Sequence, residues 1–304
     1  MRPKSDCIAC LIERTKYECD IALSADQEKI YALKEFIAFL SEHLDEEGRS
    51  PAFFGTERER ILRRHSGVED PHEEIKRRSN EVAKGLLPDA YEFYAAAGNK
   101  IEALMRIAAA ANSMEYGVKG YLFDDEVFKD KFGHTLNEKL NWNADLVIPA
   151  IKGRDKILYL NDNAGEVFFD AFVIKKLIEQ GKEVVVSPKS GPVLNDATVE
   201  DLREAASSVH LLKSELWDRV KVVPSGACIG VSLEEANEEF LDVFSDDRYL
   251  VIAKGMGNYE AISEFEAEPA YGLRGRLIYV FRAKCEPIAS SIGVKRGELV
   301  AKFV

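Results

Sequence analysis

Apolar residues in the first 120 positions recur at intervals of three or four, which is the spacing of one face of an α-helix. One such face comprises Ile30, Leu33, Ile37, Leu40 and Leu44. We therefore expect a helix over this stretch that buries those side chains against other helices.

Two further helices are predicted before residue 120. The second has its apolar positions at Ile75, Val82 and Leu86, and the third at Ile101, Leu104, Met105 and Ala108. We expect the second to begin near Asp70 and to end at Pro88, because proline lacks the N–H of a helical hydrogen bond, and the third to follow Gly98. At the same spacing the third face continues to Asn112 and Glu115. A buried polar group without a partner costs about 1–3 kcal/mol. These two residues therefore either find hydrogen-bond partners in their surroundings or line a water-filled cleft.

Beyond residue 145, short β-rich runs alternate with helical stretches. Strands are predicted at residues 156–160, 183–187, 221–223, 249–253 and 276–281, and helices at 167–180, 199–206 and 232–244. Strands and helices that alternate over short loops indicate a mainly parallel sheet with helices on both faces, and hence the α/β class. We expect a helical domain over residues 1–140 and an α/β domain over residues 141–304, with residues 120–143 as the connection.

The composition is that of a globular protein. The 304 residues are 46% hydrophobic and 31% charged, which excludes a disordered chain. The net charge of −12 argues against a dedicated nucleic-acid-binding protein, although it is compatible with a local cationic pocket for a small anion. No apolar run reaches the roughly 18 residues of a membrane span, and no apolar signal region follows the first residues. We expect a cytoplasmic protein that binds neither nucleic acid nor a membrane.

The loops that follow the predicted strands are the candidate functional segments, because parallel sheets bind ligands beyond the carboxyl ends of their strands. Four loops carry oxygen ligands, a lysine or glycines: residues 161–166, 187–198, 224–230 and 254–258. Their carboxylate and amide oxygens suit a hard divalent cation such as Mg²⁺ or Mn²⁺. Gly165 lets an anion approach the start of a helix closely, and Lys254 supplies a compact positive charge. Together these groups indicate phosphoryl chemistry.

Each of these residues also has a purely structural explanation. Asp162 or Asn163 could cap the following helix, and Thr198 with Asp201 matches a capping box. Lys254 alone could be a solvated charge. The chain lacks the glycine-rich dinucleotide fingerprint, the phosphate loop of P-loop proteins and the nucleophile elbow of α/β-hydrolases. The first strand ends in Asp-Asn-Ala rather than Asp-x-Asp, which disfavours the haloacid-dehalogenase phosphatases.

The cysteines form a second candidate feature. The five that the chain contains are too few for a disulfide scaffold of this size. Cys7 and Cys10 make a single CxxC pair, and no second CxxC completes a zinc site. The pair is either a structural metal site or redox dithiol, or two half-buried thiols on a first helix.

Eight short sequence motifs, spread over nearly the whole chain, occur in a characteristic order. They are CIAC at 7–10, DPHEEIK at 70–76, RSNE at 78–81, AN at 111–112, DNAGE at 162–166, NDAT at 195–198, KGMGNYE at 254–260 and KCEP at 284–287. Together they resemble the damage-control phosphatase family, in its short prokaryotic and archaeal branch. The chain departs from the family at one point: where the family has Gly-Asn-x-Ile-Asp, this chain ends the motif in Glu115, one methylene longer than aspartate.

The resemblance implies a fold and an activity. The fold is an N-terminal helical domain on a Rossmann-like α/β/α domain. The activity is that of a divalent-metal-dependent phosphatase of small phosphorylated metabolites, sugar phosphates among them, with Mg²⁺, Mn²⁺, Co²⁺ or Ni²⁺ as the cofactor. By motif match, the resemblance implies that the metal ligands are Asp162, Asn163 and Asp196. It also implies that Lys254 holds the phosphate and that Asn112 reaches the site from the helical domain.

The mechanistic hypothesis is metal-assisted hydrolysis, in which the cation polarises the phosphoryl group and orients a water molecule. The candidate substrate contacts are Asn112, Gly165, Glu166, Ser225 and Lys254. The candidate catalytic residues are Asp162, Lys254 and Glu115. Asp162 acts either as a ligand alone or as a nucleophile on phosphorus, and Glu115 or Glu166 is the candidate proton acceptor.

Two alternatives come from other functional classes. One is an S-adenosylmethionine-dependent protein carboxyl methyltransferase, which suits a Rossmann-like sheet, although the first strand–helix loop lacks the glycine-rich pattern that holds this cofactor. The other is a non-catalytic metal or redox module centred on Cys7 and Cys10. The sequence does not indicate the physiological substrate, the preferred metal or the oligomeric state.

Overall fold

The computed structural model describes residues 1–113 and 125–304. Within them, a seven-stranded sheet has the strand order β1-β7-β6-β5-β2-β3-β4. The strands are β1 (Leu140–Trp142), β2 (Lys156–Leu160), β3 (Glu183–Ser187), β4 (Val220–Val222), β5 (Tyr249–Lys254), β6 (Leu277–Arg282) and β7 (Leu299–Phe303). Strands β2 to β6 are parallel, β7 is antiparallel to β6, and β1 is parallel to β7. The predicted α/β class with a mainly parallel sheet is confirmed.

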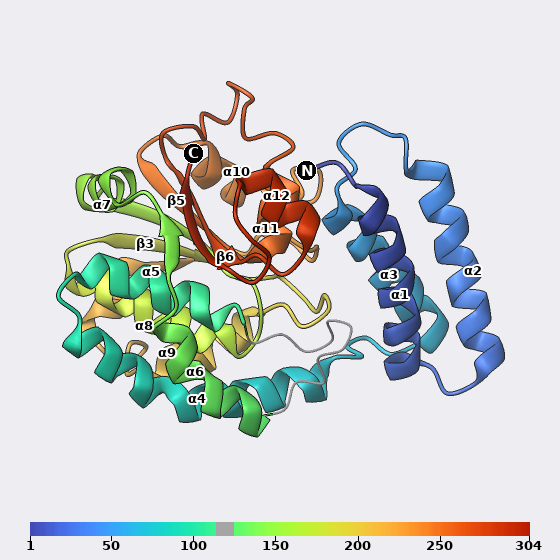
Figure 1. Ribbon diagram of the computed structural model, residues 1–304, viewed down its shortest axis with the longest axis horizontal. Helices are drawn as coiled ribbons and strands as arrows, with labels where there is room; N and C mark the ends of the chain where they lie inside the picture. The colour runs from blue at the N-terminus through green and yellow to red at the C-terminus, as the bar shows by residue number, and fades with distance from the viewer. Residues whose placement is uncertain (114–124) are drawn as a thin grey trace.

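Helices cover both faces of the sheet, because successive residues of each buried strand point to opposite faces (Figure 1). In β2, Ile157 and Tyr159 join the apolar core of one face, whereas Leu158 and Leu160 join that of the other. The first face packs against α4 (Glu73–Ala96), α5 (Lys100–Ala111), α6 (Asp125–Leu136), α7 (Ala144–Gly153), α8 (Glu166–Glu179) and α9 (Val199–Ser208). The second face packs against α10 (Glu238–Ser245), α11 (Gly255–Ile262) and α12 (Glu286–Ile292). A short 3₁₀ helix, η1 (Glu215–Arg219), precedes β4.

The first three helices form a separate layer beside the sheet (Figure 1). They are α1 (Ser5–Ala22), α2 (Asp26–His43) and α3 (Pro51–Ser66), and they bury two small apolar clusters of their own. By contrast, α4 and α5 contribute to the core of the sheet. The division into domains at residue 140 stays a prediction, and this packing favours a boundary between α3 and α4.

The buried face of α2 differs from the predicted one. Leu40 is buried as predicted, but Ile30 and Ile37 are 46% and 44% exposed, and the helix buries Ala32 and Phe36 in their place. Apolar residues surround more than half of this helix, so their spacing alone does not decide which side is buried. The large ring of Phe36 offers more apolar area to α1 and α3 than an isoleucine does.

Two expected boundaries in the helical region were wrong. Pro88 lies inside α4 rather than at its end. A proline removes one hydrogen bond, and the packing of α4 against α5 and α8 outweighs that loss over a helix of 24 residues. The connection expected over residues 120–143 includes α6 and β1 among its described residues.

The strand predictions over β2 and β3 are confirmed at both ends, and those for β4, β5 and β6 within one residue. Two short strands, β1 and β7, were missed. The helix expected over residues 232–244 begins only at Glu238, where Asn237 caps it. No helix in the described part of the chain has both the length and the hydropathy needed to cross a bilayer.

Candidate functional site

The loops after β2 and β3 meet at the carboxyl edge of the sheet, as expected for parallel strands. Asn163 and Asp196 form an isolated β-bridge. The N–H of Ala164 donates to the carbonyl of Asn195 at 2.8 Å, and the N–H of Ala197 donates to the carbonyl of Asp162 at 2.7 Å. The backbone itself therefore brings together the three residues Asp162, Asn163 and Asp196.

A glycine at the end of β5 makes room for Asp162. Gly255 has a φ of +79°, and a Cβ added to it would lie 1.9 Å from Oδ2 of Asp162. No other residue fits this position without displacing the carboxylate. The turn from β5 into α11 therefore forms one wall of the site.

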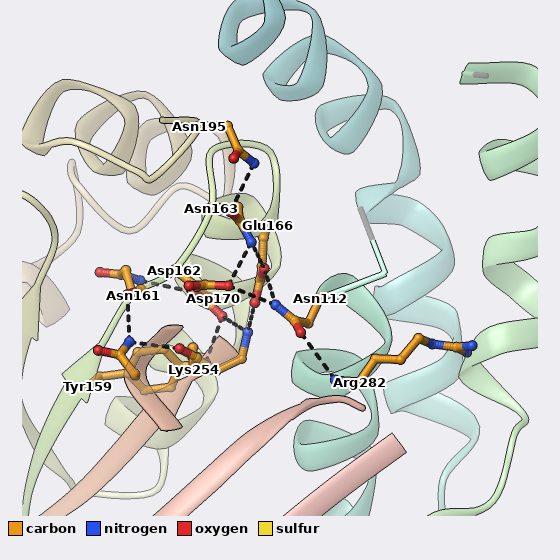
Figure 2. A network of polar contacts seen from close by, with 11 residues as sticks. Asn112, Tyr159, Asn161, Asp162, Asn163, Glu166, Asp170, Asn195, Lys254 and Arg282 are labelled. Carbon is orange, nitrogen blue, oxygen red and sulfur yellow. Dashed lines mark hydrogen bonds and ion pairs between the residues drawn. The ribbon is translucent and has the colours of Figure 1, made fainter. Parts of the chain in front are cut away.

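Three carboxamide side chains surround the acids of this edge (Figure 2). Nδ2 of Asn112, at the end of α5, donates to Oδ2 of Asp162 and to Oε2 of Glu166, at 2.9 Å each. Nδ2 of Asn163 donates to the same two oxygens at 2.7 and 3.1 Å. Nδ2 of Asn195 donates to Oδ1 of Asn163 at 2.9 Å. The structure thus places Asn112 and Glu166 directly beside Asp162.

Lys254 lies one layer deeper, with no exposed surface. Its ammonium group pairs with Oε1 of Glu166 and lies 3.1 Å from Oδ1 of Asp170 (Figure 2). Burial alone would lower the pKa of Lys254, but Asp170 and Glu166 raise it above the usual value. This lysine is therefore a permanent cation behind the acids.

The carboxylate of Asp196 has fewer polar partners than that of Asp162. Its Oδ2 is buried without a hydrogen-bond partner among the described residues and lies 3.7 Å from Nζ of Lys189. That ammonium group, itself buried, donates to the carbonyl of Gly230 at 2.6 Å. Ser225 is buried in the loop after β4, which also contains Gly230. The N–H of Ser225 donates to the carbonyl of Pro188 at 3.0 Å.

The start of α8 is held by α4. The N–H of Gly165 donates to Oδ1 of Asn80 at 2.6 Å, and the hydroxyl of Ser79 donates to the carbonyl of Ala164 at 3.2 Å. Nδ2 of Asn80 in turn donates to Oδ1 of Asp201 at 2.8 Å. The Gly165 N–H is thus already engaged, and its part in binding an anion stays a prediction. Thr198 and Asp201 form the predicted capping box.

The comparisons with known proteins agree with this geometry. The chain matches the model of the damage-control phosphatase ARMT1-like domain over residues 4–300. The chain belongs to this family. It is 31% identical over 298 residues to a damage-control phosphatase of Archaeoglobus fulgidus, with 98% of each chain covered. It is 28% identical over 303 residues to damage-control phosphatase PH1575 of Pyrococcus horikoshii, with 99% of this chain and 97% of the relative covered.

A solved structure shares the fold. A DUF89 family protein from Pyrococcus horikoshii has a TM-score of 0.81 and 28% identity, with 99% of this chain and 98% of that chain covered. The recognition from sequence motifs is therefore confirmed, and the protein is a phosphatase. Family membership supports this enzyme class over the methyltransferase and thiol-module alternatives.

The electrostatics of the candidate site are dominated by buried negative charge. Burial, followed by the charges of Glu166 and Asp196, raises the pKa of Asp162 well above its usual value. Burial also raises the pKa of Asp196 to about 6, against the lowering effect of Lys189. Without a further cation, protons are therefore held on these carboxylates more tightly than in water.

The sequence did not single out Asp170, Asn161 or Tyr159, although all three are part of the buried network. One signal was available for Asp170, because it is a lone acid in an apolar stretch of α8 and lies one turn after Glu166. Asn80 was quoted in a motif without a role. Its contact with Gly165 joins segments 85 residues apart, which no local pattern reveals.

Two further features were singled out from the sequence. Glu115 falls outside the described residues, so its role stays a prediction. Cys7, Cys10 and Cys285 are free thiols, and burial raises the pKa of each. Across residues 1–113 and 125–304, no three His, Cys, Asp or Glu side chains are grouped as a ready metal site. At the sheet edge, amides of Asn112 and Asn163 occupy the space between the acids.

Proposed function

We propose that this protein is a divalent-metal-dependent phosphatase of small phosphorylated metabolites, sugar phosphates among them. The observation that carries the proposal is a surplus of negative charge at the carboxyl edge of the sheet. That edge is where α/β proteins bind their ligands. Mg²⁺, Mn²⁺, Co²⁺ and Ni²⁺ are the candidate cofactors.

The surplus follows from the buried ionisable groups. Four carboxylates and two ammonium groups lie within the network and are at most 8% exposed: Asp162, Glu166, Asp170, Asp196, Lys189 and Lys254. When these six groups are ionised, two negative charges are left over among them, and the charge of the half-buried Lys284, which also acts on Asp162, offsets part of this excess. Lys76, a further buried cation, is paired with Asp70. A divalent cation at this edge would cancel the surplus. Without such a cation, the pKa values of Asp162 and Asp196 are raised, because ionised carboxylates are unfavourable when they are buried close together.

The donor set fits a hard cation. Asp162, Asn163 and Asp196 would hold it through carboxylate and amide oxygens, which are the ligands that such cations prefer. Oδ2 of Asp196 is a potential metal ligand because it accepts no hydrogen bond among the described residues, and its one charged neighbour there, Nζ of Lys189, is 3.7 Å away. When bound, the cation would polarise the phosphoryl group and lower the pKa of a bound water molecule.

The remaining groups of the site act through position and charge. Asn112 and Glu166 lie beside Asp162, where both would contact a substrate and Glu166 would accept a proton. Lys254 stabilises negative charge from behind Glu166, since its ammonium group is enclosed by carboxylates. Gly165 and Ser225 complete the proposed substrate contacts, and Glu115 remains the other candidate proton acceptor.

The proposal is tested with the chelated protein and a panel of phosphorylated metabolites. Hydrolysis should require one of Mg²⁺, Mn²⁺, Co²⁺ or Ni²⁺. Asp162→Ala should lower kcat/KM by about a hundredfold or more, because it removes a proposed ligand and one of the two acceptors that hold the amides of Asn112 and Asn163. Asp89→Ala, at an exposed position of α4, serves as the control and should keep full activity. Metal-independent hydrolysis, or an Asp162→Ala variant within a few-fold of the parent, would rule the assignment out.

A further inference from the structure

We propose that Asp170 is a positioning residue that holds Lys254 away from the metal ligands, so that the negative charge of the site is kept for a divalent cation. The proposal rests on the metal-dependent function above and assigns a role to a residue outside the ligand set. It starts from the position of Lys254 between two carboxylates (Figure 2).

Lys254 and the two acids are fixed by the fold. Glu166 and Asp170 are four residues apart on α8 and therefore lie on the same face of the helix, one turn after the other. Lys254, the last residue of β5, inserts its ammonium group between them. All three residues have no exposed surface, so each charge must be balanced by its neighbours rather than by water.

Asp170 is itself held by two donors. The hydroxyl of Tyr159 donates to Oδ1 at 2.7 Å, and Nδ2 of Asn161 donates to Oδ2 at 2.9 Å. Tyr159 and Asn161 are both buried, and Tyr159 belongs to β2, the central strand of the site. The carboxylate therefore has a fixed orientation toward the lysine, and charge-assisted hydrogen bonds of this kind are the stronger ones in proteins.

Lys254 has a competing set of partners. Oε2 of Glu166 shares two amide donors, from Asn112 and Asn163, with Oδ2 of Asp162. An ammonium group released from Asp170 would keep its ion pair with Glu166, and its next carboxylate would be that of Asp162, one of the proposed ligands of the divalent cation. Removing the charge of Asp170 also reduces the surplus negative charge of the network from two to one. Both effects weaken cation binding in the same direction.

The test is Mn²⁺ binding by calorimetry on the full chain, with folding checked by circular dichroism. Asp170→Asn should bind Mn²⁺ at least about tenfold more weakly than the parent, the range found when partners of metal ligands are lost. The double variant Asp170→Asn/Lys254→Met removes both charges and restores the surplus of two. It should bind Mn²⁺ within about threefold of the parent, because the two effects on charge cancel. Asp242→Asn, at an exposed position of α10, is the matched control.

The outcomes separate the two proposals. If the parent binds none of Mn²⁺, Mg²⁺, Co²⁺ and Ni²⁺ in the same calorimetry, the proposed function and this inference both fail; if it binds one of the others but not Mn²⁺, the variants are compared using that ion. If the parent binds the ion and a folded Asp170→Asn binds it equally well, the inference alone fails. A double variant as weak as the single one would mean that Asp170 acts by shape rather than by charge, and would also overturn it.

A milder variant covers the case in which Asp170→Asn does not fold. Tyr159→Phe keeps every charge and removes one of the two donors that orient Asp170. Its affinity for Mn²⁺ should fall about fivefold, the equivalent of one hydrogen bond. An unchanged affinity in this variant would contradict the proposed positioning role.

Discussion

Gly255 shows how strongly a single position constrains the site. Its backbone has a positive φ, and a Cβ would overlap the carboxylate of Asp162. Gly275 offers a near match, with a φ of +81° and open space around the added Cβ. A substitution at either glycine would strain the left-handed backbone. Only a substitution at Gly255 would also bring a Cβ into contact with the carboxylate of Asp162.

We predict that Gly255→Ala and Gly275→Ala differ sharply in activity. Each should lose roughly 1–2 kcal/mol of stability from the left-handed backbone. Only Gly255→Ala should also lose metal affinity and kcat/KM, by about tenfold or more, because Asp162 must move. Thermal melts and Mn²⁺ titrations of both variants measure this. Equal activity in the two would show that the carboxylate needs no fixed position.

At the same scale, the sequence correctly predicted that the loops after β2 and β3 meet. Asp162, Asn163 and Asp196 follow buried strands, so the rule for parallel sheets brought them together. Asp170 was not predicted, because its partners Tyr159 and Lys254 come from β2 and from the end of β5. The family resemblance implied that Asn112 reaches the site, and the packing of α5 shows that its contacts there are Asp162 and Glu166.

At the scale of elements, α3 meets α1 and the segment just before α4 in a buried polar seam. Glu59 of α3 is 2% exposed, and neither of its carboxylate oxygens has a hydrogen-bond partner among the described residues. Nδ1 of His72, just before α4, lies 3.9 Å from Oε1 of Glu59 and is also unpartnered in the described structure. Glu18 of α1 faces the same seam and pairs with Arg58.

Burial, followed by the charge of Glu18, raises the pKa of Glu59 from 4.5 to about 7, and the nearby Arg58 and Arg63 only partly oppose this. The folded state therefore holds a proton that the unfolded state releases. Stability is highest below about pH 4.5 for this group and is lost as the pH rises through about 7. Burial lowers the pKa of His72, so this ring does not supply the missing positive charge at neutral pH.

We predict that Glu59→Gln is more stable than the parent at pH 8, by up to about 3 kcal/mol. The gain should disappear near pH 4.5, where the parent carboxyl is protonated in both states. Urea unfolding between pH 4.5 and 8 measures the difference, with the exposed Glu92→Gln as the control. A difference that does not change with pH would mean that Glu59 is not held protonated by its surroundings.

The elements that the sequence predicted best are those with the least ambiguous burial. β2 and β3 are apolar on both faces, and such runs have clear ends. α2 was harder because its apolar residues surround the helix, and β1 is only three residues long. α4 continues through Pro88 because of contacts with α8 that come from distant sequence.

At the scale of the whole molecule, the chain has a net charge of −12, and part of this excess is buried at the sheet edge. A ligand that binds only the folded state stabilises it by mass action. At a concentration one hundred times its Kd, the gain is about 2.7 kcal/mol. A divalent cation bound at this edge should therefore stabilise the entire fold.

We predict that Mn²⁺ raises Tm by roughly 5 °C at this excess, and that a chelator reverses the shift. Differential scanning calorimetry of the parent and of Asp162→Ala measures it. The variant should show little response to the ion. A shift of the same size in both proteins would point to binding elsewhere.

The contacts of Asn80 and Asn112 have a consequence for engineering. Both belong to helices that precede the first strand, yet they bind the segment after β2. A fragment comprising only the strands and their later helices would lack two partners of its own acidic pocket. Moving the C-terminal half into another scaffold would therefore transfer the acidic residues without the two asparagines that hold them in position.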